Sequence, residues 1–292
     1  VVVTGSAANG NGGGGWNINH GDDGDVTITN SSADDNGSGG WNVNFGGSGP
    51  VSVTNVTGNR NGDHGMNLNN ASTATLSRIS TVANADTGLN VNATGAVSIT
   101  DATSTDNADE GFNVNALGGS TFTRVMALRN GDNGVDAYGG VATVTSAWLQ
   151  GNLDEAVGAN LSAGTVTGSI VCDNDDDGVD GAATAEGIWW GSATGPTAGS
   201  NPGGTGDGTD AAAFTPWIDT IGASADPASA GIGSAVRFTF TGGASVLGEG
   251  PGDAFGPAPF TVSTSNCTLT SSLGSGASVG ARVGAAGTLT VT

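Results

Sequence analysis

Short alternating segments of apolar and polar residues recur every 22 to 25 residues along the first part of the chain. The first copy, Gly-Trp-Asn-Ile-Asn, begins at Gly15. Related pentads begin at Gly40, Gly65, Gly88 and Gly111, and weaker copies begin at Gly134, Ala156 and Gly178. Because side chains alternate between the two faces of a strand, this period predicts one strand per repeat. Trp16 and Ile18 should face a core, and Asn17 and Asn19 should face outward.

A second apolar position recurs in every repeat, again within an alternating segment. It is occupied by Val3, Ile28, Val53, Leu76, Ile99, Phe122, Val144 and Val166. Thr or Ser flanks it on both sides in nearly every repeat, which predicts a second strand with a hydroxyl-rich outer face. Thr is a common exposed strand residue, so this face needs no special role. Lateral packing, glycan contact and ice binding stay open as alternatives.

One Asn recurs at the same turn of each repeat. These residues are Asn11, Asn36, Asn61, Asn84, Asn107, Asn130, Asn152 and Asn174. Asn tolerates left-handed backbone, and its amides can bond along a stack of identical turns. The stretch before each Asn could form a third strand, whose inward face is ambiguous. Two or three short strands per repeat are typical of a β-solenoid, whose rungs stack at about 4.8 Å.

The pentad strands, the Asn-x-Asp-x-Gly turns and the rung length resemble right-handed parallel β-helices of the pectate-lyase-like group. The segment from Trp189 to Trp217 contains Trp-Trp-Gly, Gly-Pro, Asn-Pro-Gly-Gly-Thr-Gly-Asp and Phe-Thr-Pro-Trp. It resembles the segment that closes the helix in many secreted microbial surface proteins. The resemblance implies right-handedness and an extracellular location, secreted or on the cell surface. It does not specify an activity, because this architecture hosts lyases, adhesins, tail spikes and structural fibres.

We therefore expect an all-β protein that combines a right-handed parallel β-helix of about eight rungs with a small antiparallel β domain. The β-helix should span residues 1–188 and the closing segment residues 189–220. In residues 221–292 the Asn positions stop, and Gly- and Pro-rich turns separate strand-like runs. This composition predicts a small β domain, either Ig-like or an assembly domain.

The charge balance excludes two classes of partner. The chain has 6 Arg, no Lys and 27 acidic residues, which give a formal net charge of −21. A field of this sign repels nucleic acid and acidic membrane surfaces and attracts divalent cations. The chain also lacks a run of about 18 apolar residues, so we expect no membrane span.

The placement of the basic residues favours structure over catalysis. Enzymes of the resembled group that cleave acidic polysaccharides by elimination use Arg or Lys beside calcium-binding carboxylates. Here Arg78, Asp101 and Arg124 are one repeat apart, which predicts cross-rung charge pairs. A second such column contains Arg60, Ala83, Asp106 and Arg129. We expect His20 and His64 to be solvated turn residues. No catalytic residue and no enzyme are therefore expected, although a hydrolase with two carboxylates stays open.

In six of the repeats, an acidic residue stands two positions after the recurrent Asn. These residues are Asp63, Asp86, Asp109, Asp132, Asp154 and Asp176. The last copy lies in Asp-Asn-Asp-Asp-Asp-Gly, where Asp173, Asp175 and Asp177 alternate before a Gly, a pattern that suits calcium. Asp176, Asp154 and Asp132 are further candidate ligands. The same residues also fit an ordinary solvated turn, so no cofactor is required and calcium is one of two alternatives.

Two features bear on assembly. Cys172 and Cys267 could form a disulfide that joins the β-helix to the terminal domain, with a free thiol as the equal alternative. Residues Val1, Val2, Val3 and Thr4 match Val26-Thr27-Ile28-Thr29 one period later, so the chain begins within a rung. This start predicts head-to-tail assembly with copies of the same chain, because an open strand edge favours pairing. The alternative is that the start lies inside a longer helix.

The leading functional expectation is a non-enzymatic extracellular structural protein, namely a self-assembling filament, a surface-layer subunit or an adhesin. Its partners would be copies of itself, glycans or a host or cell surface. The alternatives are a polysaccharide-active enzyme, either a lyase or a hydrolase, and a glycan- or ice-binding module.

Overall fold

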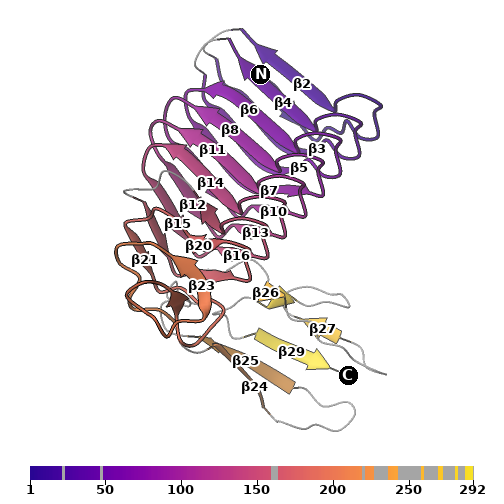
Figure 1. Ribbon diagram of the computed structural model, residues 1–292. Coiled ribbons are helices and arrows are strands. Elements are labelled where there is room, and N and C mark those ends of the chain that lie inside the picture. The colour runs from indigo at the N-terminus through magenta and orange to yellow at the C-terminus, as the bar shows by residue number, and fades with distance from the viewer. Residues whose placement is uncertain are drawn as a thin grey trace.

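The computed structural model describes residues 1–21, 24–46, 49–158 and 164–218, together with the backbone of six short strands after residue 218. Every regular element among these residues is a β-strand. The strands before residue 218 stack into a parallel β-solenoid of about eight turns, which confirms the predicted fold class (Figure 1). None of the described residues forms a helix that is long and apolar enough to cross a membrane.

The eight pentads and two strands of the closing segment form one continuous sheet of ten strands, which we call the pentad sheet. Its strands, in spatial order, are β2 (Trp16–His20), β4 (Trp41–Phe45), β6 (Met66–Ala71), β8 (Leu89–Ala93), β11 (Phe112–Ala116), β14 (Val135–Gly139), β17 (Val157–Gly158), β20 (Asp177–Val179), β23 (Gly206–Thr209) and β22 (Pro196–Thr197). All of them pair in parallel, and equivalent residues of successive repeats face one another, as in Trp16↔Trp41. Residues that lie one repeat apart in the sequence are therefore paired with each other in the sheet.

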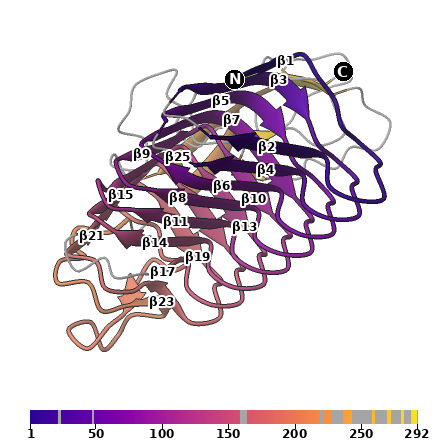
Figure 2. The same cartoon turned by 90° about the horizontal axis from the view of Figure 1, so that it is seen from above.

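The remaining solenoid strands form a sheet of thirteen that bends into two faces. The first, the hydroxyl face, contains β1 (Val2–Thr4), the leading parts of β3 (Val26–Ser32), β5 (Val51–Thr57) and β7 (Ala74–Val82), then β9 (Val97–Thr100), β12 (Ser120–Thr123), β15 (Ala142–Thr145), β18 (Thr165–Thr167) and β21 (Thr184–Glu186). The second, the third face, contains the trailing parts of β3, β5 and β7, then β10 (Thr103–Thr105), β13 (Met126–Leu128), β16 (Trp148–Gln150) and β19 (Ile170–Cys172). Each complete rung thus contributes to three faces (Figure 2).

The core is built from the two apolar columns that the sequence predicts. The pentad column is fully buried at Trp41, Met66, Leu89, Phe112 and Val135, while Trp16 is half-buried and stacks on Trp41 with ring centroids 5.6 Å apart. The second column is buried in every repeat after Val3. Since no single rung can bury its own apolar residues, stacking supplies the burial that stabilises each of them.

The third face has an inward column that the sequence left ambiguous. In β7, β10, β13, β16 and β19 the same buried position is occupied by Thr81, Ser104, Ala127, Leu149 and Val171. The two polar members are satisfied, because the Thr81 hydroxyl donates to Ser104 Oγ at 2.9 Å and Ser104 Oγ donates to the Gly111 carbonyl at 2.6 Å. From β7 to β19 this column therefore changes from polar to apolar.

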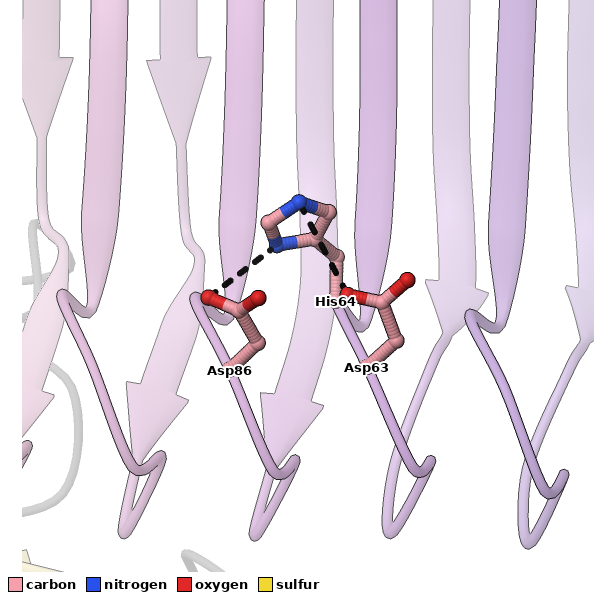
Figure 3. A group of neighbouring side chains, drawn as sticks. All are labelled: Asp63, His64 and Asp86. Carbon is pink, nitrogen blue, oxygen red and sulfur yellow. Dashed lines mark ion pairs between the residues drawn. The ribbon is translucent and has the colours of Figure 1, made fainter.

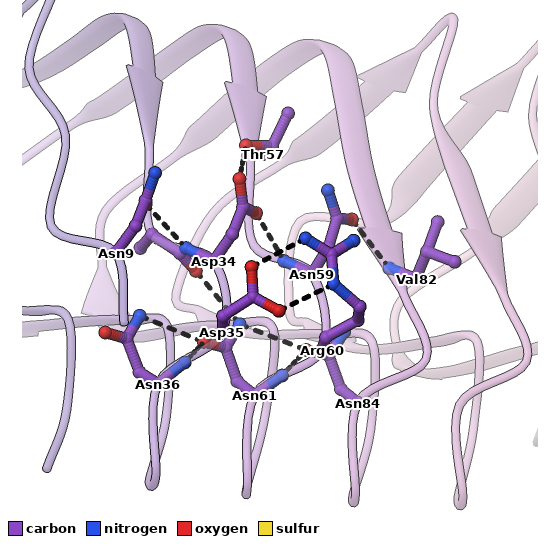
Figure 4. Close-up of polar contacts among 11 residues, drawn as sticks. Asn9, Asp34, Asp35, Asn36, Thr57, Asn59, Arg60, Asn61, Val82 and Asn84 are labelled. Carbon is purple, nitrogen blue, oxygen red and sulfur yellow. Dashed lines mark hydrogen bonds and ion pairs between the residues drawn. The ribbon is translucent and has the colours of Figure 1, made fainter. Parts of the chain in front are cut away.

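The recurrent Asn residues form a buried ladder along one edge of the solenoid (Figure 4). The Asn36 amide donates from Nδ2 to Asn61 Oδ1 at 3.0 Å, and the backbone N–H of Asn36 donates to the same oxygen. The same pair of bonds links each ladder Asn to the next, from Asn11 to Asn174. Each side chain thus satisfies a backbone N–H that a bent strand would otherwise leave unpaired.

The left-handed residue of this turn precedes the ladder Asn, although Asn itself tolerates that conformation. Positive φ angles occur at Asp35 (59°), Arg60 (55°), Ala83 (56°), Asp106 (57°) and Arg129 (52°). The reversal at this residue leaves it at the surface and turns the next side chain inward, where the Asn amide reaches the adjoining rungs. A second left-handed position separates the hydroxyl face from the third face.

The glycine that opens most pentads is required by space, although the seventh pentad opens with the buried Ala156. A Cβ on Gly40 would lie 2.5 Å from the Gly65 carbonyl oxygen and 2.7 Å from Asn61 Nδ2. Gly111 is confined in the same way by the Gly134 carbonyl and the Asn130 amide, at 2.6 and 2.7 Å. The Asn ladder and the Gly column therefore depend on each other.

Asp207 ends the ladder. It lies in β23, more than thirty residues beyond Asn174, and its Oδ2 accepts from Asn174 Nδ2 at 2.7 Å and from the Asn174 backbone N–H at 3.1 Å. Its Oδ1 accepts from the Asp173 backbone N–H. A carboxylate suits this position because the last member of the ladder needs only to accept hydrogen bonds. Burial raises the pKa of Asp207, although the three donors act in the opposite direction.

The strands after residue 218 are antiparallel. The strands β24 (Ile221–Asp226), β25 (Val236–Gly242), β29 (Gly287–Val291) and β27 (Leu269–Ser271) form one sheet in this order, and β26 (Ala258–Pro259) pairs with β28 (Gly280–Ala281). This agrees with the small antiparallel unit expected from the sequence. Whether this unit is Ig-like or an assembly domain depends on the connections between its strands. These connections lie outside the described residues.

Candidate functional site

The acidic residues of the repeats gather along one edge of the solenoid. The turn between the Asn ladder and the pentad sheet holds two neighbouring columns, which we call the acidic edge. The first contains Asp63, Asp86, Asp109, Asp132, Asp154 and Asp176, and the second contains His64, Thr87, Glu110, Asn133, Glu155 and Asp177. The ladder holds the backbone just before this turn, so the carboxylates recur at the spacing of the rungs.

Three groups along this edge bring metal-ligating atoms together. They are Asp63 with His64 and Asp86, Asp109 with Glu110 and Asp132, and Asp154 with Glu155 and Asp176. Within each group, one potential ligand atom per residue lies within 4.8 Å of the others. Three of the predicted calcium ligands, Asp132, Asp154 and Asp176, thus belong to such groups. Asp173, Asp175 and Asp177 belong to none among the described residues.

Ionisation of several carboxyls on the acidic edge is opposed by their surroundings. Burial, together with Glu110 and Asp86, raises the pKa of Asp109 to about 6. Burial and the neighbouring carboxylates also raise the pKa values of Asp154 and Glu155. A proton or a bound cation would relieve this repulsion, because either one reduces the negative charge held between rungs.

Asp136 is a functional candidate that the sequence analysis missed. It stands in β14 at the outward position that earlier pentads fill with Asn, yet only 3% of it is exposed. Tyr138 donates a hydrogen bond to its Oδ2. Burial raises the pKa of Asp136 to about 6, with Glu110 and Asp132 acting in the same direction against the Tyr138 hydrogen bond. The change from Asn to Asp in the pentad was the signal available in the sequence.

The two histidines are half-buried instead of solvated, so that expectation was wrong. His20 Nε2 and His64 Nδ1 are buried without a hydrogen-bond partner. His64 lies between the carboxylates of Asp63 and Asp86 (Figure 3). His20 packs edge-on against Phe45, with ring centroids 6.0 Å apart.

The outer face of the pentad sheet is covered by amides. Asn44 donates to Asn19 at 3.2 Å, Asn69 to Asn44 at 3.1 Å and Asn92 to Asn69 at 3.1 Å, so one column is linked along the stack. The parallel column, which begins at Asn17, is linked to it through bonds such as Asn44 to Asn42. Together the two columns form an uncharged polar surface, which we call the amide face. It ends at Asp136.

Grooves border the amide face on both sides. One groove of about 450 Å³ is lined by Asn44, Asn69, Asn70, Asn92, Ala93, Thr94, Asn115 and Leu117. The other, of about 290 Å³, is lined by glycines and Ser38 of the first two turns, by Trp16 and Trp41, by amides of the column that begins at Asn17, and by Asp63 and His64. Leu117 is 65% exposed and adds an apolar contact surface to the first groove.

Two of the predicted cross-rung pairs form, those of Arg124 and Arg129, whereas the predicted pair of Arg78 with Asp101 is absent from the ion pairs of the described residues. Arg124 binds Asp101 through two bonds of 2.7 and 3.1 Å, and Arg129 binds Asp106 through two bonds of 2.8 Å. Arg60 also forms such a pair, with Asp35 of the preceding rung, a partner that the sequence analysis did not name. These side chains are exposed or half-buried, so each pair contributes little to stability.

The residues implicated in assembly lie as follows. Val2, Val3 and Thr4 pair with Thr27, Ile28 and Thr29, which confirms the register expected from the 25-residue period. Val1 and Val2 are exposed, and Val3 is half-buried. Cys172 is buried, and burial raises the pKa of its thiol to about 12. Cys267 lies outside the described residues, so the disulfide stays a prediction.

Comparison with protein-family models, with curated proteins and with solved structures finds no match to this chain. The function is therefore argued from the geometry of the solenoid faces.

Proposed function

We propose that this chain is a non-enzymatic extracellular structural protein that acts as an adhesin, with the amide face as its contact surface for uncharged polysaccharide. The observation that carries the proposal is the linked array of Asn side chains on the outside of the pentad sheet. Of the three expected forms, filament, surface layer and adhesin, the adhesin makes most use of this array. A stacked solenoid is rigid across many rungs, so it can present binding groups at a fixed spacing.

The hydrogen-bonding capacity of the amides supports a hydroxyl-rich ligand. A side-chain amide has two N–H groups and two acceptor lone pairs. Asn69 donates one N–H to Asn44 and accepts one from Asn92, which leaves one donor and acceptor capacity for a ligand. Successive rungs repeat this arrangement at about 4.8 Å. Sugar hydroxyls both donate and accept, so they complement such a surface.

Charge supports an uncharged polymer. The amide face carries no ionised side chain before Asp136, whereas the whole molecule has a formal net charge of −21. The acidic edge runs along one margin of the same sheet, so an anionic polysaccharide would be repelled from it. The exposed Leu117 at the other margin can contact the apolar faces of sugar rings.

Co-sedimentation with insoluble polysaccharides tests the proposal. The protein should pellet with one or more neutral polymers, such as chitin or a β-glucan, and should remain in solution with alginate. Asn69→Ala combined with Asn92→Ala should abolish pelleting, because both changes remove amides from the groove. The matched control, Thr54→Ala with Thr100→Ala on the hydroxyl face, should bind as the unchanged protein does. Equal loss in both variants, or no binding to any neutral polymer, contradicts the proposal.

One observation favours the enzyme alternative. A buried carboxyl with a pKa near 6 is suited to general acid catalysis, and Asp136 has this property beside Glu110 and Asp132. Its carboxyl is, however, 3% exposed and bonded to Tyr138, which restricts access to a substrate. Release of reducing sugars from a bound polymer, abolished by Asp136→Asn, would establish the hydrolase in place of the adhesin.

A further inference from the structure

The acidic edge contains one position where an imidazole replaces the side chains usual for its column. Equivalent turns carry Gly14, Gly39, Thr87, Glu110, Asn133 and Glu155, whereas the third complete turn carries His64. Its ring lies between Asp63 of its own turn and Asp86 of the next (Figure 3). We call these three residues the His64 site.

The donor set of the His64 site differs from those of the other groups on this edge. The groups at Asp109 and Asp154 offer carboxylate oxygen alone, which suits calcium or magnesium. The His64 site combines an imidazole nitrogen with two carboxylates. Nitrogen and oxygen donors in this combination suit zinc and other divalent first-row transition metals.

The environment of the imidazole is an independent sign that this site binds a ligand. His64 Nδ1 is buried and has no hydrogen-bond partner. Asp86 Oδ1 is 3.6 Å away from it, which is too long for a hydrogen bond. Asp86 Oδ1 instead accepts from the Thr87 backbone N–H at 2.8 Å, which fixes the carboxylate beside the ring. A buried ring nitrogen without a partner is unfavourable, so a bound ion would satisfy it.

The three residues are close enough to share one ion. Ligand atoms around a tetrahedral zinc ion lie about 3.4 Å from one another, given metal–ligand distances of about 2.0 to 2.2 Å. The two ring nitrogens of His64 lie 3.6 Å from Asp86 and 3.9 Å from Asp63, and one atom of each residue lies within 4.8 Å of the others. Small side-chain rotations would therefore bring one nitrogen and two oxygens around a common centre.

The shape of the surface favours metal entry. The His64 site adjoins the groove of about 290 Å³ whose other wall contains Gly14 and Gly39. Since these neighbours have no side chains, water and ions can approach from the side of the first two turns.

We propose that Asp63, His64 and Asp86 bind one divalent transition-metal ion, with zinc as the best match to the donor set. Each residue supplies one ligand atom, and water in the groove completes the coordination. The site would cross-link two successive turns, since Asp63 and His64 belong to one turn and Asp86 to the next. It does not depend on the proposed adhesin function.

Titration with zinc chloride alone, at about pH 7.5, tests the site by calorimetry. The full chain should bind an equivalent of zinc that His64→Ala and Asp86→Asn each weaken by more than about 100-fold, since removal of outer-shell partners alone costs 10- to 100-fold. Cobalt chloride should give the visible absorption of a low-symmetry site, and His64→Ala should remove it. Excess calcium should not displace either metal.

Two control variants separate this site from other sources of binding. His20→Ala removes the other histidine, and Asp132→Asn alters a group made of carboxylates alone. Both should keep the high-affinity equivalent. The proposal is overturned if His64→Ala binds zinc as the unchanged protein does, or if Asp132→Asn or His20→Ala removes the equivalent. Circular dichroism of each variant shows whether the rungs remain folded, and Asp63→Asn supplies a second test if Asp86→Asn does not fold.

Discussion

At the scale of single residues, the solenoid depends on backbone conformations that most side chains disfavour. In the column before the Asn ladder, the residue is left-handed whether it is Asp, Arg or Ala. Ala83 has φ of 56° and has neither the local hydrogen bonding of Asp nor the cross-rung ion pair of Arg129. Strain at this position is therefore offset only by the turns above and below it.

Ala83→Gly should raise the free energy of unfolding by up to about 1 kcal/mol, because glycine has no Cβ to oppose a left-handed backbone. The matched control is Ala85→Gly, two residues later, where φ is not positive. That change should be neutral or destabilising, since it only adds entropy to the unfolded chain. Chemical denaturation of both variants measures the difference, and an equal loss of stability in the two would contradict the assignment of strain to Ala83.

At the scale of elements, buried and exposed Asn columns should differ in their contribution to stability. Asn107 accepts from the backbone and the side chain of Asn84 and donates to Asn130 Oδ1, all within the buried ladder. Asn92 makes a single bond to Asn69 on the half-buried amide face. The residue type is the same, but water can replace only the second set of bonds.

Asn107→Ala should therefore lower the free energy of unfolding by about 3 kcal/mol, because it leaves two buried donors of Asn84 unpaired. Asn92→Ala should lower it by less than about 1 kcal/mol, since solvent reaches the partners that it leaves. Denaturant titration of both variants against the unchanged protein provides the measurement. Similar values for the two changes would show that the ladder is not a principal source of stability.

At the scale of the whole molecule, the net charge and the acidic edge link stability to pH. The pKa values of Asp109 and Asp136 are raised to about 6, above the ordinary value of 3.8. Between these values the folded chain retains protons that the unfolded chain has released. The stabilisation from these groups is therefore complete below pH 3.8 and is lost as pH rises through about 6.

In the presence of chelator, the melting temperature should consequently be higher at about pH 5 than at about pH 7. Asp109→Asn combined with Asp136→Asn should reduce this rise, because both groups then lack a titratable proton. The same measurement with calcium in place of chelator extends the test. A cation on the acidic edge would replace the proton, so it should raise the melting temperature mainly at the higher pH. A melting temperature that falls from pH 7 to pH 5 would contradict the raised pKa values.

The sequence by itself determined the rung length, the two apolar columns, the Asn ladder and the cross-rung pairs of Arg124 and Arg129. All of these follow from spacing, because residues one repeat apart become neighbours once the strands stack in parallel. The pentad alternation also fixed which residues enter the core. Such features need no knowledge of how each turn bends.

Only the tertiary structure decided features that depend on the turn conformation or on contacts outside the repeat. The left-handed residue before the ladder turns the Asn side chain inward, and the bend of the turn holds His64 between Asp63 and Asp86. Asp207 caps the ladder from a segment with no counterpart in the repeat. Spacing could not predict these contacts, because they are set by backbone angles and by chain connections that no periodic pattern encodes.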